Sequence, residues 1–205
     1  MTAAHPTKKE VVSEFRRSGI LKAARKVFAR HGYDGATMDD VAEASSIAKG
    51  TLYLYFKSKQ QIYLGVLKQD LQSLREENER AIQAAKSGPD KVRAFITTRF
   101  DFFERHRDFF RIYNSDISAI FITAHPMQKD LREFYLEQAG ILTAIITDAI
   151  RAGELREVPA EAAAFAIYDM TRACVARRIL GLGHQDGDGD AKTLIDLISR
   201  GIGRV

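Results

Sequence analysis

Residues that build covalent or metal-held scaffolds are scarce in this sequence. Its one cysteine, Cys174, excludes an intrachain disulfide and a multi-cysteine zinc site, and we interpret it as a small core residue. The five histidines are scattered along the chain. The acidic run Asp186–Asp190 lacks the glycine and the glutamate of a calcium loop, because Ala191 and Leu197 stand at those positions. We therefore expect no metal and no cofactor.

Long apolar runs and catalytic motifs are missing as well. No segment approaches the roughly 18 apolar residues that a membrane helix needs. Residues 1–17 lack the continuous apolar stretch of a signal peptide. The sequence contains no glycine-rich nucleotide loop and no Gly-x-Ser-x-Gly motif. These absences predict a cytoplasmic protein that is not an enzyme and does not enter a membrane.

The charges that are present are unevenly distributed. Residues 1–60 hold eleven Lys and Arg against six Asp and Glu, a net charge of +5, whereas the remaining residues sum to −1. A basic segment on a near-neutral body is typical of a chain that meets a polyanion at one end. A lysine-rich solvated surface would give the same numbers, so charge by itself suggests nucleic acid without establishing it.

Apolar residues recur at helical spacing along nearly the whole chain, which predicts an all-α fold of about nine helices. We expect an N-terminal three-helix helix-turn-helix head over residues 1–60 and a larger C-terminal helical bundle over residues 61–205. The predicted helices cover about residues 11–31, a short helix after Thr37, residues 49–56, residues 59–85, a helix capped by Asp90, and residues 108–122, 126–152, 159–182 and 190–201.

Local signals mark several helix ends in the first sixty residues. Gly32 and Gly35, on either side of Tyr33, should end the first helix, whose apolar stripe we expect to run from Phe15 to Phe28. Thr37 has the form of an N-cap with an acid three residues later, and Ser58 with Gln61 has the form of a capping box.

The third predicted helix carries an unusual outward surface. Leu52 and Phe56 share one face at i, i+4 spacing and can bury against the first helix. Two aromatics and a leucine remain outside, an odd set for a solvated face but a suitable one for a DNA groove, where hydroxyls and ammonium groups donate to phosphates and apolar groups touch thymine methyls. Gly50 would let the DNA backbone approach closely. This outward set consists of Lys49, Gly50, Thr51, Tyr53, Leu54 and Tyr55.

Residues 16–63 resemble the DNA-binding heads of the TetR/AcrR family of bacterial repressors. The resemblance is carried in order and at matching spacing by Ile20-Leu21-Lys22-Ala23-Ala24, Phe28, Gly32-Tyr33, Thr37, Val41-Ala42 and the run Lys49–Lys59. It implies that Thr37 and Lys59 contact phosphates, that Tyr53 and Tyr55 lie near the DNA backbone, and that Lys49 and Thr51 lie nearest the base edges. Partial core packing is the alternative for Tyr53.

Two positions depart from the family pattern. Members usually have glycine in the turn and serine as the cap of the third helix, where this chain has Ser46 and Ala48. Losing a hydroxyl cap costs roughly 1 kcal/mol, and a non-glycine turn residue can be strained. The base-level register of the third helix is therefore left open.

The C-terminal body offers a candidate effector site. Aromatic residues concentrate between residues 95 and 135, which suggests a cavity for an apolar or amphipathic ligand, with tight core packing as the alternative. Arg99 lies on the apolar face of its helix, and a buried arginine needs an anionic partner. We favour an internal acid, Asp148 or Asp169, over a ligand carboxylate or phosphate. The candidate ligand-binding residues are Phe95, Arg99, Phe103, Phe110, Tyr113, Asn114, Phe134 and Arg172.

Beyond residue 63 the family resemblance is architectural, and it implies that the last two helices pair with those of a second copy. Alanines and Met170 on the eighth helix, and Leu194, Leu197 and Ile198 on the ninth, suit such a bundle or, alternatively, the monomer's own core. We thus expect a homodimeric, sequence-specific transcriptional regulator, a repressor released from a pseudo-palindromic DNA operator by a small-molecule effector. A transcriptional activator and a helical ligand-binding protein that does not bind DNA are the alternatives.

Overall fold

The computed structural model describes residues 7–119, 128–182 and 189–203. Within these ranges the chain forms nine α-helices and no strand, apart from an isolated antiparallel bridge between Leu155 and Gly203. The predicted all-α class is confirmed. The chain divides into two compact units, Met1–Asp70 and Leu71–Val205, a later division than the expected boundary at residue 60.

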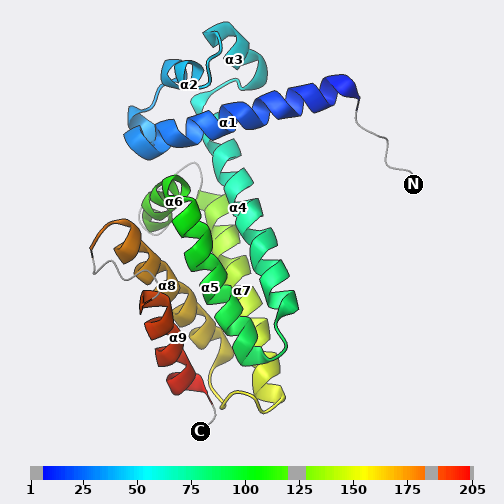
Figure 1. Ribbon diagram of the computed structural model, residues 1–205, viewed down its shortest axis with the longest axis vertical. Helices are drawn as coiled ribbons and strands as arrows, with labels where there is room; N and C mark the ends of the chain where they lie inside the picture. The colour runs from blue at the N-terminus through cyan, green and yellow to red at the C-terminus, as the bar shows by residue number, and fades with distance from the viewer. Residues whose placement is uncertain (1–6, 120–127, 183–188, 204–205) are drawn as a thin grey trace. The chain divides into compact units, whose positions relative to one another are not determined.

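The first unit contains three complete helices and the start of a fourth (Figure 1). These helices are α1 (Lys8–Gly35), α2 (Met38–Ala44), α3 (Lys49–Tyr55) and α4 (Lys59–Ala84), the last of which continues into the second unit. Gly32 interrupts α1 with φ 69° and ψ 178°, a backbone that favours glycine, so the helix breaks where the sequence predicts. It begins earlier than expected, at Lys8.

The buried face of α1 differs from the predicted stripe at its N-terminal end. Ile20, Ala24, Val27 and Phe28 are buried, but the Phe15 side chain is 80% exposed. The expectation that Phe15 joins the core is therefore wrong.

The second unit is a helical bundle that contains the end of α4 and five further helices. These are α5 (Gly88–Arg105), α6 (Arg107–Ala119), α7 (Gln128–Arg151), α8 (Ala160–Ile179) and α9 (Gly189–Ile202). Ser87, not Asp90, is the N-cap of α5: its hydroxyl accepts from the Asp90 backbone N–H at 3.2 Å, and Asp90 lies three residues inside. The predicted start of the seventh helix at residue 126 and the acidic run from residue 186 to 188 lie outside the described residues.

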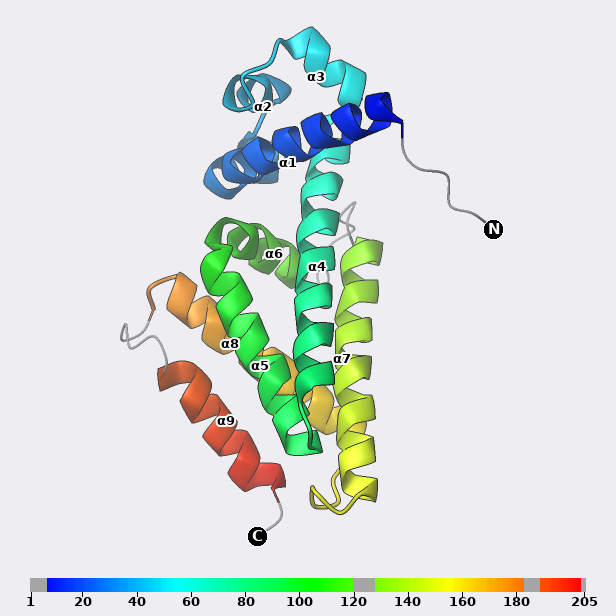
Figure 2. The same ribbon diagram turned by 45° about the vertical axis from the view of Figure 1, so that its right-hand side comes forward.

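Helix α5 occupies the middle of this bundle. It packs against α7, α8 and α9, and α7 also packs along α8. Both views show α5 between α9 and α7 (Figures 1 and 2). Gly88 at its start permits a close approach to α7, because a Cβ there would lie 2.2 Å from that of Ala149. None of the described helices is long and apolar enough to cross a membrane.

Candidate nucleic-acid interface and effector site

Helix α3 presents one buried face and one exposed face. Leu52 and Phe56 are 0% and 1% exposed, which confirms their predicted burial. Leu54 is 75% exposed and Tyr53 38% exposed, so the Tyr53 side chain is accessible but partly covered by the protein. The remaining members of the outward set are exposed at Lys49 and Gly50 and half-buried at Thr51 and Tyr55. The structure therefore brings all six residues onto accessible parts of one short helix.

Gly50 leaves open space at the first turn of α3. An added Cβ would meet no protein atom within 4 Å, and the residue does not adopt a left-handed conformation. The fold of the head therefore does not itself require glycine here. A residue without a side chain instead keeps room for a group from outside the protein to approach the helix start.

Thr37 caps α2 as predicted. Its hydroxyl accepts from the Asp40 backbone N–H at 3.1 Å, while the Thr37 backbone N–H donates to the Asp40 carboxylate at 2.8 Å. These hydrogen bonds to Thr37 lower the pKa of Asp40 below its usual value. The Thr37 hydroxyl also donates to Asp40 Oδ2 at 2.7 Å, so a phosphate bound at Thr37 would compete with this acid.

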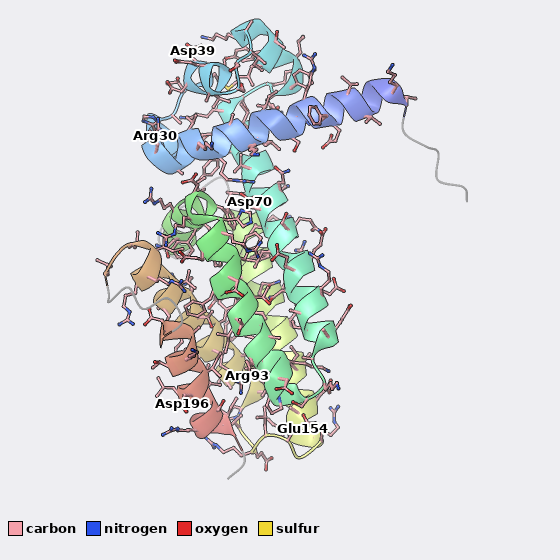
Figure 3. The ribbon with its side chains drawn as sticks, in the orientation of Figure 1. Arg30, Asp39, Asp70, Arg93, Glu154 and Asp196 are labelled. Carbon is pink, nitrogen blue, oxygen red and sulfur yellow. The ribbon has the colours of Figure 1, made fainter. Side chains whose placement is uncertain are left out.

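Lys49 forms an ion pair across the head. Its Nζ lies 2.8 Å from Asp39 Oδ1, and Asp39 projects from α2 (Figure 3). The hydrogen bond to Asp39 raises the pKa of Lys49 above its ordinary value. Both side chains are more than half exposed, so the pair is weak and a DNA phosphate or base edge can replace the carboxylate.

Lys59 has an internal role in the head. Its ammonium donates to the backbone carbonyls of Tyr33, Ala36 and Asp34 at 2.6, 2.9 and 3.3 Å, and it lies 4.5 Å from the centroid of the Tyr33 ring. These carbonyls follow the break in α1 and lead into α2. All three N–H groups of the ammonium have partners, and a phosphate would have to displace one of them.

The turn between α2 and α3 shows the consequence of both departures from the family pattern. Ser46 has φ 55°, the single described non-glycine residue in the left-handed region. Ala48 is the N-cap of α3 and supplies no side-chain hydrogen bond. The predicted strain and the predicted loss of a hydroxyl cap are thus both present, and α3 nevertheless forms.

A basic groove that the sequence analysis missed adjoins α3. It has a volume of about 510 Å³, and Thr51 and Tyr55 of α3 face the α1 side chains across it. Its α1 wall carries Arg16, Lys22, Lys26 and Arg30. Three of these follow one another at i, i+4, i+8, so a count of basic residues at helical spacing could have found them.

In the second unit, Arg99 is 0% exposed and lies among aromatic rings. Its guanidinium carbon is 4.5 Å from the ring centroid of Tyr168, 5.3 Å from that of Phe95 and 5.5 Å from that of Phe103. Its Nη2 donates to the Tyr168 hydroxyl at 3.1 Å and its Nη1 to Gln138 Oε1 at 3.4 Å.

The expectation that Asp148 or Asp169 pairs with Arg99 is wrong. Asp148 is 74% exposed and pairs with Arg151, and Asp169 accepts from the Tyr135 hydroxyl at 2.9 Å. No carboxylate among the described residues forms an ion pair with Arg99. Helical periodicity placed the arginine on the apolar face correctly, but it could not tell which side chains of other helices would surround the guanidinium.

The predicted aromatic residues come together as a packed cluster. The Phe103 ring stacks on Tyr113 at 5.5 Å between centroids and meets Phe110 edge-on at 5.0 Å, and Phe134 meets Tyr113 edge-on at 6.5 Å. Burial raises the pKa of Tyr113 well above its usual value, so its hydroxyl is neutral. Close ring contacts favour the alternative of core packing for these side chains.

Asn114 and Arg172 lie beside this cluster and interact with each other. Arg172 Nη1 donates to Asn114 Oδ1 at 3.5 Å, and Arg172 Nε lies 3.5 Å from Asp169 Oδ1. The sequence analysis missed three residues of the buried cluster, Asn78, Gln138 and Tyr168. Asn78 follows Leu74 by four residues, and Gln138 follows Phe134 by four. Both are therefore polar residues in register with an apolar stripe, which is the sequence signal by which Arg99 was found.

Comparisons with known proteins place the head in a recognised group. Residues 20–66 match the family model described as bacterial regulatory proteins, tetR family. The chain is 33% identical over 97 residues to the transcriptional activator FasR of Mycolicibacterium smegmatis, an alignment that covers 47% of this chain and 44% of FasR. It is 25% identical over 138 residues to the fatty acid metabolism regulator protein of Bacillus subtilis, covering 67% of this chain and 70% of that protein.

The fold likeness extends over nearly the whole chain. The structure of FadR from Bacillus subtilis in complex with stearoyl-CoA superposes with a TM-score of 0.77 at 22% identity, covering 90% of this chain and 98% of the other. The head of this chain is thus similar in sequence to bacterial regulators, and both of its units are similar to theirs in fold.

Proposed function

We propose that this chain, whose residues 20–66 match the tetR family of bacterial regulatory proteins, is a transcriptional regulator of that family. It acts as a homodimeric repressor that a small-molecule effector releases from DNA. The exposed face of α3 is the observation that carries this proposal. Leu54 and Tyr53 are exposed while Leu52 and Phe56 anchor the helix from behind. A rigid helix with an apolar and hydroxyl-bearing outer face fits the major groove of DNA.

In the proposed complex, Lys49, Thr51 and Leu54 approach base edges, while Tyr53 and Tyr55 approach the sugar-phosphate backbone. Gly50 admits that backbone at the helix start, where added atoms would meet no protein. Thr37 approaches a phosphate from the start of α2. Lys59 supports the interface by joining the end of α1 to the start of α4, or else donates to a phosphate directly.

The pattern of buried and exposed residues on α8 and α9 supports the proposed dimer. Their inner faces are buried, with Ile167, Leu194 and Ile198 less than a tenth exposed, whereas Met170 is 40% and Leu197 62% exposed. Exposed alanines follow the outer face of α8, and small residues permit a close helix approach. We propose that these outer faces form a four-helix bundle with a second copy.

A population shift explains how an effector would act. A dimer places its two heads in successive major grooves only when they lie roughly 34–36 Å apart. Helix α4 begins in the first unit and ends in the second. An effector that binds better to the form with another head spacing therefore weakens DNA binding.

The sign of regulation is the point at which the relatives differ. FasR is an activator, and its alignment covers 44% of its length, whereas other similar proteins are repressors, such as NicS of Pseudomonas putida. Activation is therefore the second candidate. The head has the same task in both cases, so we test sign and binding separately.

The binding test compares two exposed leucines. Duplexes selected from a random library by the purified protein are titrated by fluorescence anisotropy with wild type, Leu54→Ala and Leu136→Ala. Leu54 is 75% exposed on α3 and Leu136 48% exposed on α7. We expect Leu54→Ala to weaken binding of the selected duplex by about 1 kcal/mol or more. We expect Leu136→Ala to bind that duplex as wild type does. Equal behaviour of the two variants would contradict the assignment of α3.

The sign is tested with the selected site placed at a reporter promoter. Repression predicts higher expression when this chain is removed, and activation predicts lower expression. Native mass spectrometry of the purified protein determines whether it is a dimer and whether a small molecule copurifies. A monomer bound to DNA as a single copy would contradict the dimer.

A further inference from the structure

The buried cluster around Arg99 contains hydrogen-bond donors that the protein leaves unused. Arg99 and Gln138 are both 0% exposed, and among the described residues neither Arg99 Nε nor Gln138 Nε2 has a hydrogen-bond partner; the Asn78 Oδ1 acceptor of the same cluster lacks one as well. The Gln138 oxygen already accepts from Arg99 Nη1 at 3.4 Å and from Asn78 Nδ2 at 3.2 Å. A buried donor without a partner is costly, and native proteins rarely keep one without a reason.

The charge of this cluster is unbalanced as well. The aromatic rings of Phe95, Phe103 and Tyr168 around the guanidinium stabilise a cation only in part. A single positive charge thus lies in an apolar interior with two neutral hydrogen-bond acceptors, the Tyr168 hydroxyl and the Gln138 oxygen. Burying a charge in this way is unfavourable unless an anion neutralises it.

We propose that Arg99 and Gln138 bind the carboxylate of a small organic acid, and that this acid is the effector. The inference rests on the proposed function, which assigns an effector to the helical body. The two unused N–H groups, Arg99 Nε and Gln138 Nε2, donate to the carboxylate oxygens. Phe103 and Tyr113 stack on each other beside the guanidinium, so the apolar part of the acid enters by separating these packed rings and then contacts them and Phe95.

The charge count selects a carboxylate over a phosphate. Arg99 is the one cation among the fully buried described residues, so a monoanion leaves the cluster neutral. A phosphate monoester would bring more than one negative charge to a single guanidinium and leave uncompensated charge. The thioester group of an acyl-coenzyme A is neutral, so it would leave the guanidinium unpaired. A neutral amide would satisfy hydrogen bonds but would leave the guanidinium unpaired.

The position of the cluster provides a route from ligand to regulation. Its polar residues come one from each of five consecutive helices: Asn78 from α4, Arg99 from α5, Tyr113 from α6, Gln138 from α7 and Tyr168 from α8. Arg99 Nη2 donates to the Tyr168 hydroxyl, which lies 2.6 Å from that of Tyr113. A carboxylate that draws Arg99 away from Tyr168 therefore alters contacts on every one of these helices, including α4.

The test pairs each acid with its neutral amide. Full-length protein is titrated by calorimetry with acetate, benzoate, phenylacetate and octanoate, with the four primary amides, and with octanoyl-CoA. The variants are Arg99→Met, and Arg93→Met as a matched control, because Arg93 is an exposed arginine on the same helix (Figure 3). Thermal unfolding of each protein without ligand is recorded in parallel.

We expect at least one acid to bind and its amide to bind roughly 30-fold more weakly or not at all, since losing a buried charged partner costs about 2 kcal/mol or more. Arg99→Met should lose the acid and keep or raise its melting temperature, because it removes an uncompensated buried charge. Arg93→Met should bind as wild type does. A purely structural Arg99 would instead lower the melting temperature when replaced.

Three outcomes overturn the inference: no acid binds, acid and amide bind equally, or Arg99→Met binds the acid as wild type does. Binding of octanoyl-CoA without octanoate also overturns it while leaving an effector site in the body. DNA titrations of the same proteins separate the two proposals. If DNA binds but no acid releases it, the carboxylate inference fails and the DNA-binding function stands, and if DNA does not bind, the proposed function itself fails.

Discussion

Replacing Lys59 by methionine distinguishes the two roles considered for this residue. Methionine keeps a long apolar stem and removes the ammonium that donates to the carbonyls of Tyr33, Asp34 and Ala36. Hydrogen bonds to a charged group contribute about 1.5–3 kcal/mol, and a partly exposed cation over a ring about 0.5–1 kcal/mol. Because Lys59 is half-buried, solvent screens part of this, and we expect a loss of about 2 kcal/mol.

For a chain of this length, about 2 kcal/mol lowers the melting temperature by roughly 4–8 °C, which circular dichroism measures directly. The control is Lys57→Met, since Lys57 is exposed and its ammonium donates to the Tyr53 carbonyl alone, at 3.0 Å. We expect that variant to change stability by no more than about 0.5 kcal/mol.

DNA binding supplies the result that would refute this interpretation. If Lys59 only closes the end of α1, the variant binds more weakly but the dependence of affinity on salt keeps its slope. If Lys59 contacts a phosphate, the slope of log K against log salt falls by about 0.9. An unchanged melting temperature together with a reduced slope would show that the hydrogen bonds to the α1 carbonyls are not what Lys59 contributes.

Four further predictions concern the first unit. Ser46→Gly should raise the free energy of unfolding in urea by about 1 kcal/mol, because glycine adopts φ 55° without strain. The control Ser45→Gly, at φ −91°, should lower that free energy. A lower free energy of unfolding for both variants would contradict the strain argument. Asp39→Asn should strengthen DNA binding in anisotropy titrations, since it removes the acid that holds Lys49, and weaker binding would mean that the pair positions Lys49. Lys26→Ala, in the basic groove, should reduce the salt slope of DNA binding by about 0.9 if phosphates lie there, and an unchanged slope would exclude that contact. Burial raises the pKa of Asp70 to about 6, although the positive charge of Arg25 partly opposes this rise. The pKa of the folded state thus lies above the unfolded value of 3.8. The stability that protonation of Asp70 provides is therefore complete below about pH 4 and is lost as the pH rises through 6. Asp70→Asn should remove this loss, as measured by urea midpoints from pH 4 to pH 7, and an identical pH profile for the two proteins would count against a raised pKa.

Much of the head could be predicted from the sequence because its determinants are local. Thr37 with Asp40 form a capping box that lies within four consecutive residues, and Gly32 breaks α1 through its own backbone freedom. The burial of Leu52 and Phe56 follows from their spacing on one helix. The extent of α1 and the exposure of Phe15 were mispredicted, because periodicity does not state how far the neighbouring elements reach.

The effector region was predicted less completely for the same physical reason. The apolar face of α5 could be derived from spacing, and Arg99 does lie on it. Its partners come from residues 39 and 69 positions away along the chain, and no local signal connects such distant residues. An acidic partner was a sound electrostatic expectation, and the three-dimensional packing supplied a glutamine, a tyrosine and aromatic rings in its place.

The sequence by itself therefore determined the helices, the helix-turn-helix head and the residues that face outward from α3, because spacing, caps and glycines act within a few residues of one another. Only the tertiary structure decided that Lys59 closes the end of α1, that a basic groove adjoins α3 and that no described carboxylate pairs with Arg99. Each of these depends on which distant side chains packing brings within a few ångströms, and it is this packing that surrounds the buried guanidinium with aromatic rings, a glutamine and a tyrosine.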